Sequence, residues 1–446
     1  MFFTRIVHAL WGDLKPGEFK KFSLLALGSF FLIGAWWPLK TLKDTIFINT
    51  VGPIHITVAK ILSVALFFPL VLLYSRLVAY FTKQKLIYFF IGAYTIVGLL
   101  LVYLLTVPSI GLANPEMHAG RILGWAFYVY CESYISLLLA LYQSFINDVI
   151  TPESAKRGYG LIAFGTQLGG FLFTLLGNCL TYDTTQYTSR VPLIVLISLA
   201  MFVMVAVIVY ILQCVLGKEN LKGYEEQPGL HHTRVPGESV GFFDGLKLLL
   251  TRPYVAGIFA LVFFQEFIST MMFFQLSLLT KVTYQDPALV TKFFFHIALA
   301  IQAIACLFGL FGTSYFYRRF GIQFSLVAYP LLIGVFIVCY LLQPTLYSVV
   351  YVVLIAKALG YALNQPAKEM LYIPTSKNIK YKSKAWIDMF GMRFAKATGS
   401  GITRLIGPAV MLTGGFALIL IGVWASLAHR LGKVFKKTID NNEIIE

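Results

Sequence analysis

The feature that most constrains this chain is a series of about twelve apolar runs, each long enough to cross a lipid bilayer as a helix. Only 13% of the residues are Asp, Glu, Lys or Arg, and 58% are hydrophobic. A soluble core of this size would need a much more polar surface. The sequence therefore predicts an all-α polytopic membrane protein. The runs cover roughly residues 22–48, 54–80, 86–107, 122–147, 157–182, 191–216, 254–282, 291–314, 322–342, 346–366, 385–411 and 413–431.

Lys and Arg are distributed unevenly among the turns between these runs. If the spans alternate in direction, the even-numbered turns receive most of the basic residues, whereas odd-numbered turns such as 107–121 and 183–190 receive hardly any. Because short cytoplasmic loops are enriched in Lys and Arg, this asymmetry predicts an even number of spans with both termini cytoplasmic. The even-numbered turns contain Arg76, Lys83 and Lys85; Lys156 and Arg157; Arg318 and Arg319; and Lys368, Lys377, Lys380, Lys382 and Lys384.

A polar segment divides the runs into two groups of six. We interpret residues 217–253, which contain prolines and mixed charges, as a cytoplasmic linker. It would join an N-terminal six-helix half, 1–216, to a C-terminal six-helix half, 254–446, that ends in a short cytoplasmic tail. Tyr74 to Arg76 after the second run and Tyr315 to Arg319 after the eighth form a faint internal repeat. Together these features predict about 12 transmembrane helices in a major-facilitator-like arrangement.

The sequence contains no motif for a metal site, a cofactor site or nucleotide hydrolysis. His231 and His232 lack companion ligands at helical spacing. The five cysteines form no CxxC pair, and the GxxxxGK[ST] pattern does not occur. We therefore predict no metal, no cofactor and no enzymatic activity, with a membrane enzyme and a ligand-binding sensor as the competing classes. The net charge of +16 is explained by the cytoplasmic loops, so no nucleic-acid partner is predicted.

Four ionisable residues lie near the middle of predicted spans. Glu132 and Glu266 are about ten and twelve residues into their runs, which at about 1.5 Å per residue places them near the bilayer midplane. Lys357 and Lys396 are each about eleven residues into theirs. An ionisable group at that depth costs several kcal/mol unless it faces a polar cavity or a partner. Each of the four is therefore a candidate site residue.

Three further cations lie within predicted spans. Lys43 and Lys60 lie toward the outer part of adjacent antiparallel spans, where snorkelling to the surface is an alternative. Arg393 lies on the same helical stripe as Lys396. Cations thus outnumber the two carboxylates, which suits an anionic substrate better than a metal ion or an organic cation. The alternative is that these charges are paired only to hold helices in register.

Several blocks of sequence have a distinctive pattern. They are "LKTLKDTIF" from Leu39, "ITVAKIL" from Ile56, "FYVYCESYISLL" from Phe127 and "INDVITPESAKRGYGLIAFG" from Ile146. The most specific is "QPAKEMLYIP" from Gln365, followed by "RFAKATGSG". With these blocks the chain resembles the ATP/ADP antiporter family of nucleotide transporters from obligate intracellular bacteria and plastids. The resemblance implies a carrier in the lipid bilayer of a bacterial inner membrane, whose substrate is ATP, ADP or a related nucleotide. A monomer is expected because one chain supplies both halves of the pathway.

The resemblance also implies roles for particular residues. Lys43, Glu132, Glu266 and Lys396 fall where the family keeps two lysines and two glutamates that are important for nucleotide transport. Lys60 and Lys357 also match family lysines.

Two departures concern the block around Pro366. Gly360 replaces a common lysine, and Gln365 replaces the usual aspartate before Pro366. The residues after Glu266 also lack the lysines that usually follow it. These departures leave open that ATP and ADP are not the main cargo. The alternatives are a proton-coupled importer of other nucleotides or NAD, if either glutamate can take up a proton, and a major-facilitator-type carrier of another organic anion.

We predict a phosphate site, because Lys and Arg must replace the water that phosphates lose in a low-dielectric cavity. Glu132 and Glu266 are expected to pair with its cations between cargoes. The predicted nucleobase pocket consists of aromatic residues near these charges, for which packing is the alternative role. The phosphate site comprises Lys43, Lys60, Lys357, Arg393 and Lys396, and the nucleobase pocket Tyr128, Phe264, Phe267 and Tyr361.

Overall fold

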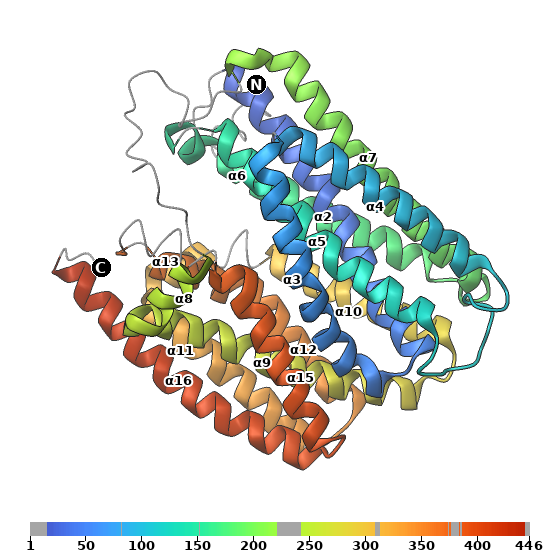
Figure 1. Cartoon of the computed structure of the whole chain (residues 1–446). Coiled ribbons are helices and arrows are strands. Elements are labelled where there is room, and N and C mark those ends of the chain that lie inside the picture. The colour runs from blue at the N-terminus through green and yellow to red at the C-terminus, as the bar shows by residue number, and fades with distance from the viewer. Residues whose placement is uncertain are drawn as a thin grey trace. The chain divides into compact units, whose positions relative to one another are not determined.

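The computed structural model is built mainly from long α-helices, and it describes residues 16–81, 83–150, 152–220, 242–307, 313–372, 374–375, 383 and 386–441 (Figure 1). Nine of the described helices are long and apolar enough to cross a membrane. Each corresponds to one predicted run. They are α2 (Pro16–Thr50), α4 (Lys83–Thr106), α5 (Ile122–Val149), α6 (Pro152–Leu180), α7 (Tyr187–Asn220), α9 (Pro253–Thr283), α10 (Pro287–Leu307), α11 (Thr313–Leu342) and α16 (Val410–Asp440).

Three further helices correspond to the remaining predicted runs. α3 extends over Ile56–Tyr80 and follows a turn in which Gly52 has a φ of 110°, a conformation that favours glycine. The other two helices are interrupted by π-helical turns. α12 (Leu346–Leu359) continues through the π turn η5 (Gly360–Asn364) into α13 (Gln365–Leu371), and α15 (Met392–Ile406) follows the π turn η7 (Ile387–Gly391). The predicted all-α architecture of about twelve spanning helices is therefore confirmed.

The predicted linker, 217–253, is described only at its two ends. Residues 217–220 continue α7, and the short helix α8 occupies Phe242–Thr251. Residues 221–241 lie outside the described part of the chain.

The described residues form two compact units. The first unit comprises residues up to 51, those from 65 to 220, and residues 286–299 at the start of α10. The second unit comprises residues 52–64, from the turn before α3 into its first part, together with residues 242–285 and those from 300 onward. Thus the start of α3 packs with the second unit, and the start of α10 packs with the first.

Small residues allow close helix packing inside the first unit. α2 lies along α6 and α7, and also contacts α5. A Cβ atom added to Gly169 of α6 would lie 2.1 Å from the carbonyl oxygen of Phe30 in α2, which is far inside van der Waals contact. Tyr142 of α5 donates a hydrogen bond of 2.9 Å to the carbonyl oxygen of Leu25. Such packing of small residues is typical of helices that associate in lipid.

The second unit is organised around α9, which contacts α12, α15 and α16. α11 and α16 lie side by side, and Tyr329 and Trp424 pack edge to face between them with ring centroids 5.4 Å apart. Gln275 of α9 donates a hydrogen bond of 3.1 Å to Thr413 at the start of α16. These contacts fix α9 within the unit, so Glu266 is held against α12 and α15.

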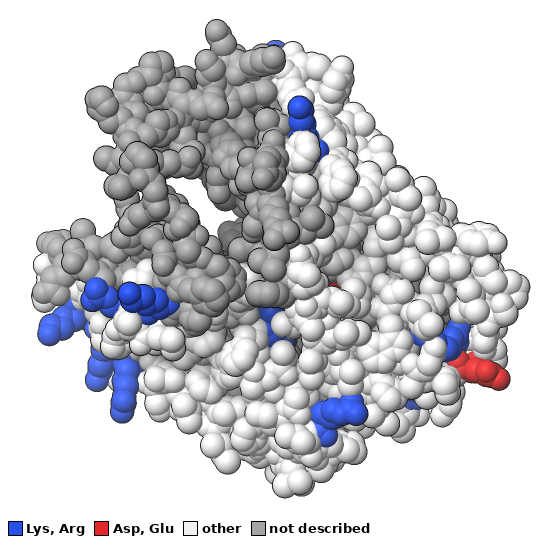
Figure 2. Space-filling model, viewed as in Figure 1, with Lys and Arg blue, Asp and Glu red and all other residues white. Residues whose placement is uncertain are grey.

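The described surface is mostly uncharged. Figure 2 shows broad areas of one face without Lys, Arg, Asp or Glu. Large apolar side chains, such as those of Ile96, Leu331 and Leu405, are exposed at the surface of the protein. A helical bundle in water would not leave so much apolar area uncovered, whereas in lipid this is the favourable arrangement.

Candidate functional site

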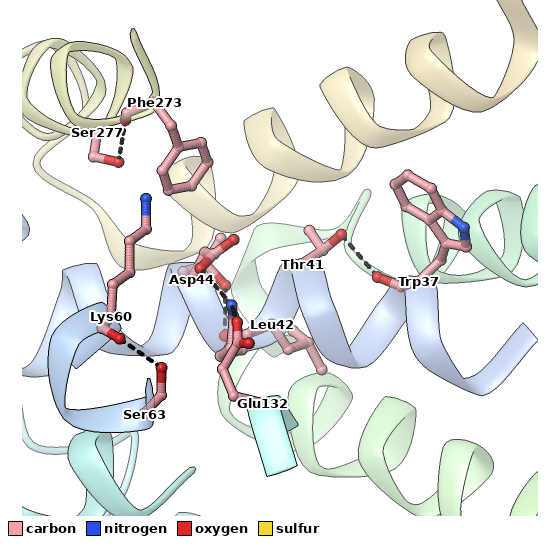
Figure 3. A network of polar contacts seen from close by, with 11 residues as sticks. Trp37, Thr41, Leu42, Asp44, Lys60, Ser63, Glu132, Phe273 and Ser277 are labelled. Carbon is pink, nitrogen blue, oxygen red and sulfur yellow. Dashed lines mark hydrogen bonds and ion pairs between the residues drawn. The ribbon is translucent and has the colours of Figure 1, made fainter. Parts of the chain in front are cut away.

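The first charged cluster lies inside the first unit, between α2 and α5. The ammonium nitrogen of Lys43 donates a hydrogen bond of 2.5 Å to Glu132 Oε1 and lies 3.3 Å from Asp44 Oδ1. Lys43 is 6% exposed. Figure 3 shows Glu132 and Asp44 directed toward the same point. Lys43 therefore does not extend to the membrane surface by snorkelling, because its ammonium group is enclosed by protein.

Aromatic rings close this cluster on the side of α5. Tyr128 and Glu132 are four residues apart on α5, so both side chains face α2. The Lys43 ammonium lies 4.4 Å from the centre of the Tyr128 ring, a cation–π contact. Phe47 packs against Tyr128 and Trp125 with ring centroids 5.2 and 5.0 Å apart. One cation thus lies between two carboxylates in a compact, aromatic environment.

The second charged cluster lies inside the second unit, where α9 faces α12 and α15. Glu266 Oε2 is 3.7 Å from the ammonium nitrogen of Lys396 and 4.0 Å from that of Lys357. The side chains of Lys396 and Lys357 are 43% and 24% exposed, and that of Glu266 is 13% exposed. The separations exceed hydrogen-bond length, so this carboxylate holds two cations loosely. Arg393, one turn before Lys396 on α15, is partly buried.

A polar group that sequence reasoning missed lies beside Glu266. Gln265 Oε1 accepts a hydrogen bond of 2.7 Å from Asn364 Nδ2 and one of 2.9 Å from Lys368 Nζ. The sequence predicts Lys368 in a cytoplasmic turn. It lies instead in α13 and is 6% exposed. One feature of the sequence could have indicated that Lys368 and Asn364 lie together. They are four residues apart, which places both side chains on one helical face.

Lys60 belongs to the part of α3 that packs with the second unit. Its ammonium nitrogen lies 4.7 Å from the centre of the Phe273 ring of α9 (Figure 3). The contact is a cation–π interaction, which suits a cation that is only partly exposed to solvent.

The four aromatic residues of the predicted nucleobase pocket differ in exposure. Tyr128 and Phe267 are 1% and 2% exposed. Phe267 packs against Phe263, whereas Phe264 is half-buried and Tyr361, in the π turn, is 37% exposed. In this conformation Phe264 and Tyr361 are the more accessible pair.

Comparison with known proteins gives two matching families. The sequence profile of the Major Facilitator Superfamily matches residues 133–368, and that of the TLC ATP/ADP transporter matches residues 337–435. The chain is 21% identical to ADP,ATP carrier protein 1 of Rickettsia typhi, covering 99% of this chain and 98% of the relative. It is 23% identical to ADP,ATP carrier protein 1 of Chlamydia pneumoniae, covering 97% and 94%.

Solved structures of transporters share the fold. A bacterial homologue of the iron transporter ferroportin superposes with a TM-score of 0.65 at 10% identity, over 93% of this chain and 99% of that chain. The nucleoside transporter NupG gives a TM-score of 0.52 at 13% identity, over 95% and 100%. The resemblance to ATP/ADP antiporters is thus confirmed by a family profile and by relatives of nearly equal length. Because its profile covers more than half of the sequence, the chain belongs to the Major Facilitator Superfamily.

Proposed function

We propose that this protein carries nucleotides across a membrane, exchanging ATP for ADP or another nucleoside triphosphate for its diphosphate, by alternating access. The relatives named ADP,ATP carrier protein and the TLC ATP/ADP transporter profile support the substrate class. The observation that carries the proposal is the cluster in the second unit, where two partly exposed lysines share one carboxylate at 3.7 and 4.0 Å.

The chemistry of this cluster suits phosphate. A phosphate group loses its hydration when it enters a low-dielectric site, and charge-assisted hydrogen bonds from Lys or Arg replace that water. Lys357 and Lys396 can reorient toward a substrate oxygen at little cost, because their contacts with Glu266 are longer than hydrogen bonds. Arg393, on the same helix as Lys396, adds a planar donor that can bind two phosphate oxygens at once.

The balance of charge also supports exchange over one-way transport. Without cargo, Glu266 faces two ammonium groups, so the three side chains carry a net positive charge. A bound polyanion adds negative charge next to these cations, which lowers the cost of enclosing them in protein. We infer that the empty carrier changes conformation slowly and that a bound polyanion removes the barrier, which makes uptake depend on nucleotide at the opposite side.

One feature favours a second candidate, a carrier of nucleotides other than ATP and ADP. Gly360 stands where the resemblance to ATP/ADP antiporters implies a lysine. A Cβ atom at this position would lie 2.9 Å from Tyr329 Oη and 3.2 Å from Gln265 Nε2, so a lysine does not fit without rearrangement. A site without this lysine has a different arrangement of donors, and this difference supports altered base or phosphate preference.

We also propose the location and assembly of the carrier. The asymmetry of Lys and Arg between the turns supports two cytoplasmic termini. The nucleotide carriers of Rickettsia and Chlamydia support a bacterial inner membrane. A monomer is proposed because one chain supplies all spans of the fold.

The test is uptake of labelled ATP into lipid vesicles that contain the purified protein. One set of vesicles is loaded with ADP, the other is empty, and unlabelled GTP, CTP, UTP and NAD serve as competitors. We expect uptake only into loaded vesicles, without release of inorganic phosphate. Equal uptake into empty vesicles would contradict exchange. Absence of transport for every compound would overturn the nucleotide function.

A further inference from the structure

The end of α16 extends past the start of its neighbour α9 in the second unit. Two contacts fix the register of these two helices. Gln275 of α9 donates a hydrogen bond to Thr413, and a Cβ atom at Gly257 would lie 2.9 Å from Cδ1 of Leu431. Both contacts give the same antiparallel register, in which the first residue of α9 lies level with Phe435. The last residues of α16 therefore extend beyond the end of α9.

The apolar part of α16 is about as long as the hydrocarbon core of a bilayer is thick. Residues 410–428 include no Asp, Glu, Lys or Arg, and at about 1.5 Å per residue they extend over about 28 Å. The hydrocarbon core of a typical bilayer is about 30 Å thick. The remaining residues of the helix, 429–440, therefore begin at the level of the lipid headgroups.

Exposed cations form a stripe along this end of α16. Arg430, Lys433 and Lys437 are three and four residues apart, so their side chains share one face of the helix. All three are exposed, as is Lys436 next to them. Among the residues that the structure describes, no carboxylate forms an ion pair with these four cations. The buried face of the helix, which includes Leu431, packs on α9.

Two further exposed cations lie just before α9. Arg252 immediately precedes this helix, and Lys247 lies in α8. Leu249 of α8 belongs to a buried cluster with Val255 of α9, which holds α8 against the second unit. Figure 2 shows Lys and Arg side chains gathered on the side of the molecule where Figure 1 places the C-terminus. We define the basic patch as Lys247, Arg252, Arg430, Lys433, Lys436 and Lys437.

Exposed apolar side chains lie among these cations. Leu250 of α8 is 78% exposed, and Val434 and Ile439 of α16 are 46% and 43% exposed. In water this mixture leaves apolar area uncovered. At the boundary between acyl chains and headgroups, the apolar groups contact lipid tails while Lys and Arg reach the phosphates. The basic patch therefore fits a lipid surface better than a soluble acidic protein or a free phosphate compound.

We propose that the basic patch binds the headgroups of anionic phospholipids. Each Lys or Arg close to an anionic membrane surface strengthens binding about fivefold. Because α16 packs on α9, which carries Glu266, lipid bound at this end stabilises the unit that contains the second charged cluster. The proposal does not depend on which substrate the protein carries.

The experiment is native mass spectrometry of the full-length protein in a neutral detergent. The probes are phosphatidylglycerol, which is anionic, and phosphatidylcholine, which has no net charge. We expect phosphatidylglycerol to bind at least about tenfold more tightly, since several cations contribute. Raising the ammonium acetate concentration should remove most of this difference, because salt screens exposed charges.

Two double variants test whether the position of the charges matters. Lys433→Gln combined with Lys437→Gln removes two cations of the stripe and is expected to weaken phosphatidylglycerol binding about 25-fold, with phosphatidylcholine binding unchanged. Lys20→Gln combined with Lys85→Gln is the matched control. It removes two exposed cations near the starts of α2 and α4, which are predicted to lie on the same side of the membrane. The control should change binding by less than about twofold.

The outcomes separate the lipid from other ligands. Equal binding of the two lipids by the wild-type protein, or equal losses in the two double variants, would overturn the proposal. A soluble polyglutamate peptide that binds as tightly as phosphatidylglycerol, and depends on Lys433 and Lys437, would replace the lipid by an acidic protein. Glycerol phosphate is expected not to compete, and competition at equal concentration would indicate a site for soluble phosphate instead. Thermal melting without lipid verifies that each variant is folded.

Discussion

In the first unit one ammonium group lies between two carboxylates, whereas in the second unit two ammonium groups share one carboxylate. The distances between the oppositely charged atoms are also shorter in the first unit than in the second. The bond from Lys43 to Glu132 is 2.5 Å, and Glu266 is 3.7 and 4.0 Å from its lysines. Lys43 is almost fully buried, and Lys396 is 43% exposed on its side chain.

This difference separates two uses of charge in a membrane. A short ion pair whose cation is buried, such as that of Lys43 (side chain 7% exposed) with Glu132 (30% exposed), holds helices together and does not release its cation cheaply. A loose, partly solvated group with excess positive charge costs little to rearrange and attracts anions. The same residue types, Lys and Glu at membrane depth, thus favour a structural role in the first unit and a binding role in the second.

The largest expected effect is on stability, when Lys43 is removed. In Lys43→Ala, Glu132 and Asp44 remain close together without their cation, and breaking a buried pair in this way costs about 3–5 kcal/mol. We expect a melting temperature in detergent that is several degrees lower, or loss of monodisperse protein. Lys43→Arg, which keeps the charge, should recover part of the stability. An unchanged melting temperature for Lys43→Ala would mean that the first cluster is not a tight pair.

The next largest effect is on binding, when Lys396 is removed. In the proposed phosphate site Lys396→Ala loses one or two charge-assisted hydrogen bonds to phosphate, so ATP uptake into loaded vesicles is expected to fall about 10- to 100-fold. The melting temperature should change little, because a long and partly exposed ion pair contributes about 0–1 kcal/mol. Normal uptake by this variant would remove Lys396 from the site. A large loss of stability would erase the contrast between the two clusters.

A smaller effect, of opposite sign, is expected for Glu266. In the proposed site this carboxylate competes with substrate for Lys357 and Lys396, so Glu266→Gln should bind ADP about three- to tenfold more tightly, since each of the two loose ion pairs that it removes is worth about 0–1 kcal/mol. The exchange rate should fall because the cargo is released slowly. Glu132→Gln is the matched variant in the first unit. Tighter ADP binding by Glu132→Gln as well would show that both carboxylates act alike.

The helices and the principal pairing partners were predictable from sequence because both depend on strong, local signals. Apolar runs of spanning length specify helices wherever the solvent is lipid. The high cost of isolated charges in lipid marks Glu132, Glu266, Lys357 and Lys396 as residues that need partners. The structure brings Glu266 together with the two lysines, and Glu132 together with Lys43.

The buried position of Lys368 beside Gln265 was not predictable, because it depends on the π turn between Lys357 and Lys368. The regular period of 3.6 residues per turn does not hold across this π turn, so it does not predict which side chains share a face on either side. No residue pattern in the sequence predicts the π turn itself. The flanking basic residues 377–384 made Lys368 look like part of a cytoplasmic loop. The exposure of the aromatic side chains was also not predictable from sequence. Packing against Phe47 decides whether Tyr128 covers a lysine or faces a cavity.

The smallest expected effect tests how the first cluster is closed. Tyr128→Phe keeps the ring that lies 4.4 Å from the Lys43 ammonium, so the cation–π contact is retained and the stability should change by less than about 1 kcal/mol. Tyr128→Leu removes the ring and should cost about 1–2 kcal/mol more. ATP uptake should be the same in Tyr128→Phe and wild type if Tyr128 only covers Lys43. If Tyr128→Leu were as stable as wild type yet transported GTP or CTP in a changed order, Tyr128 would instead contact the base, and the first cluster would share the binding role of the second.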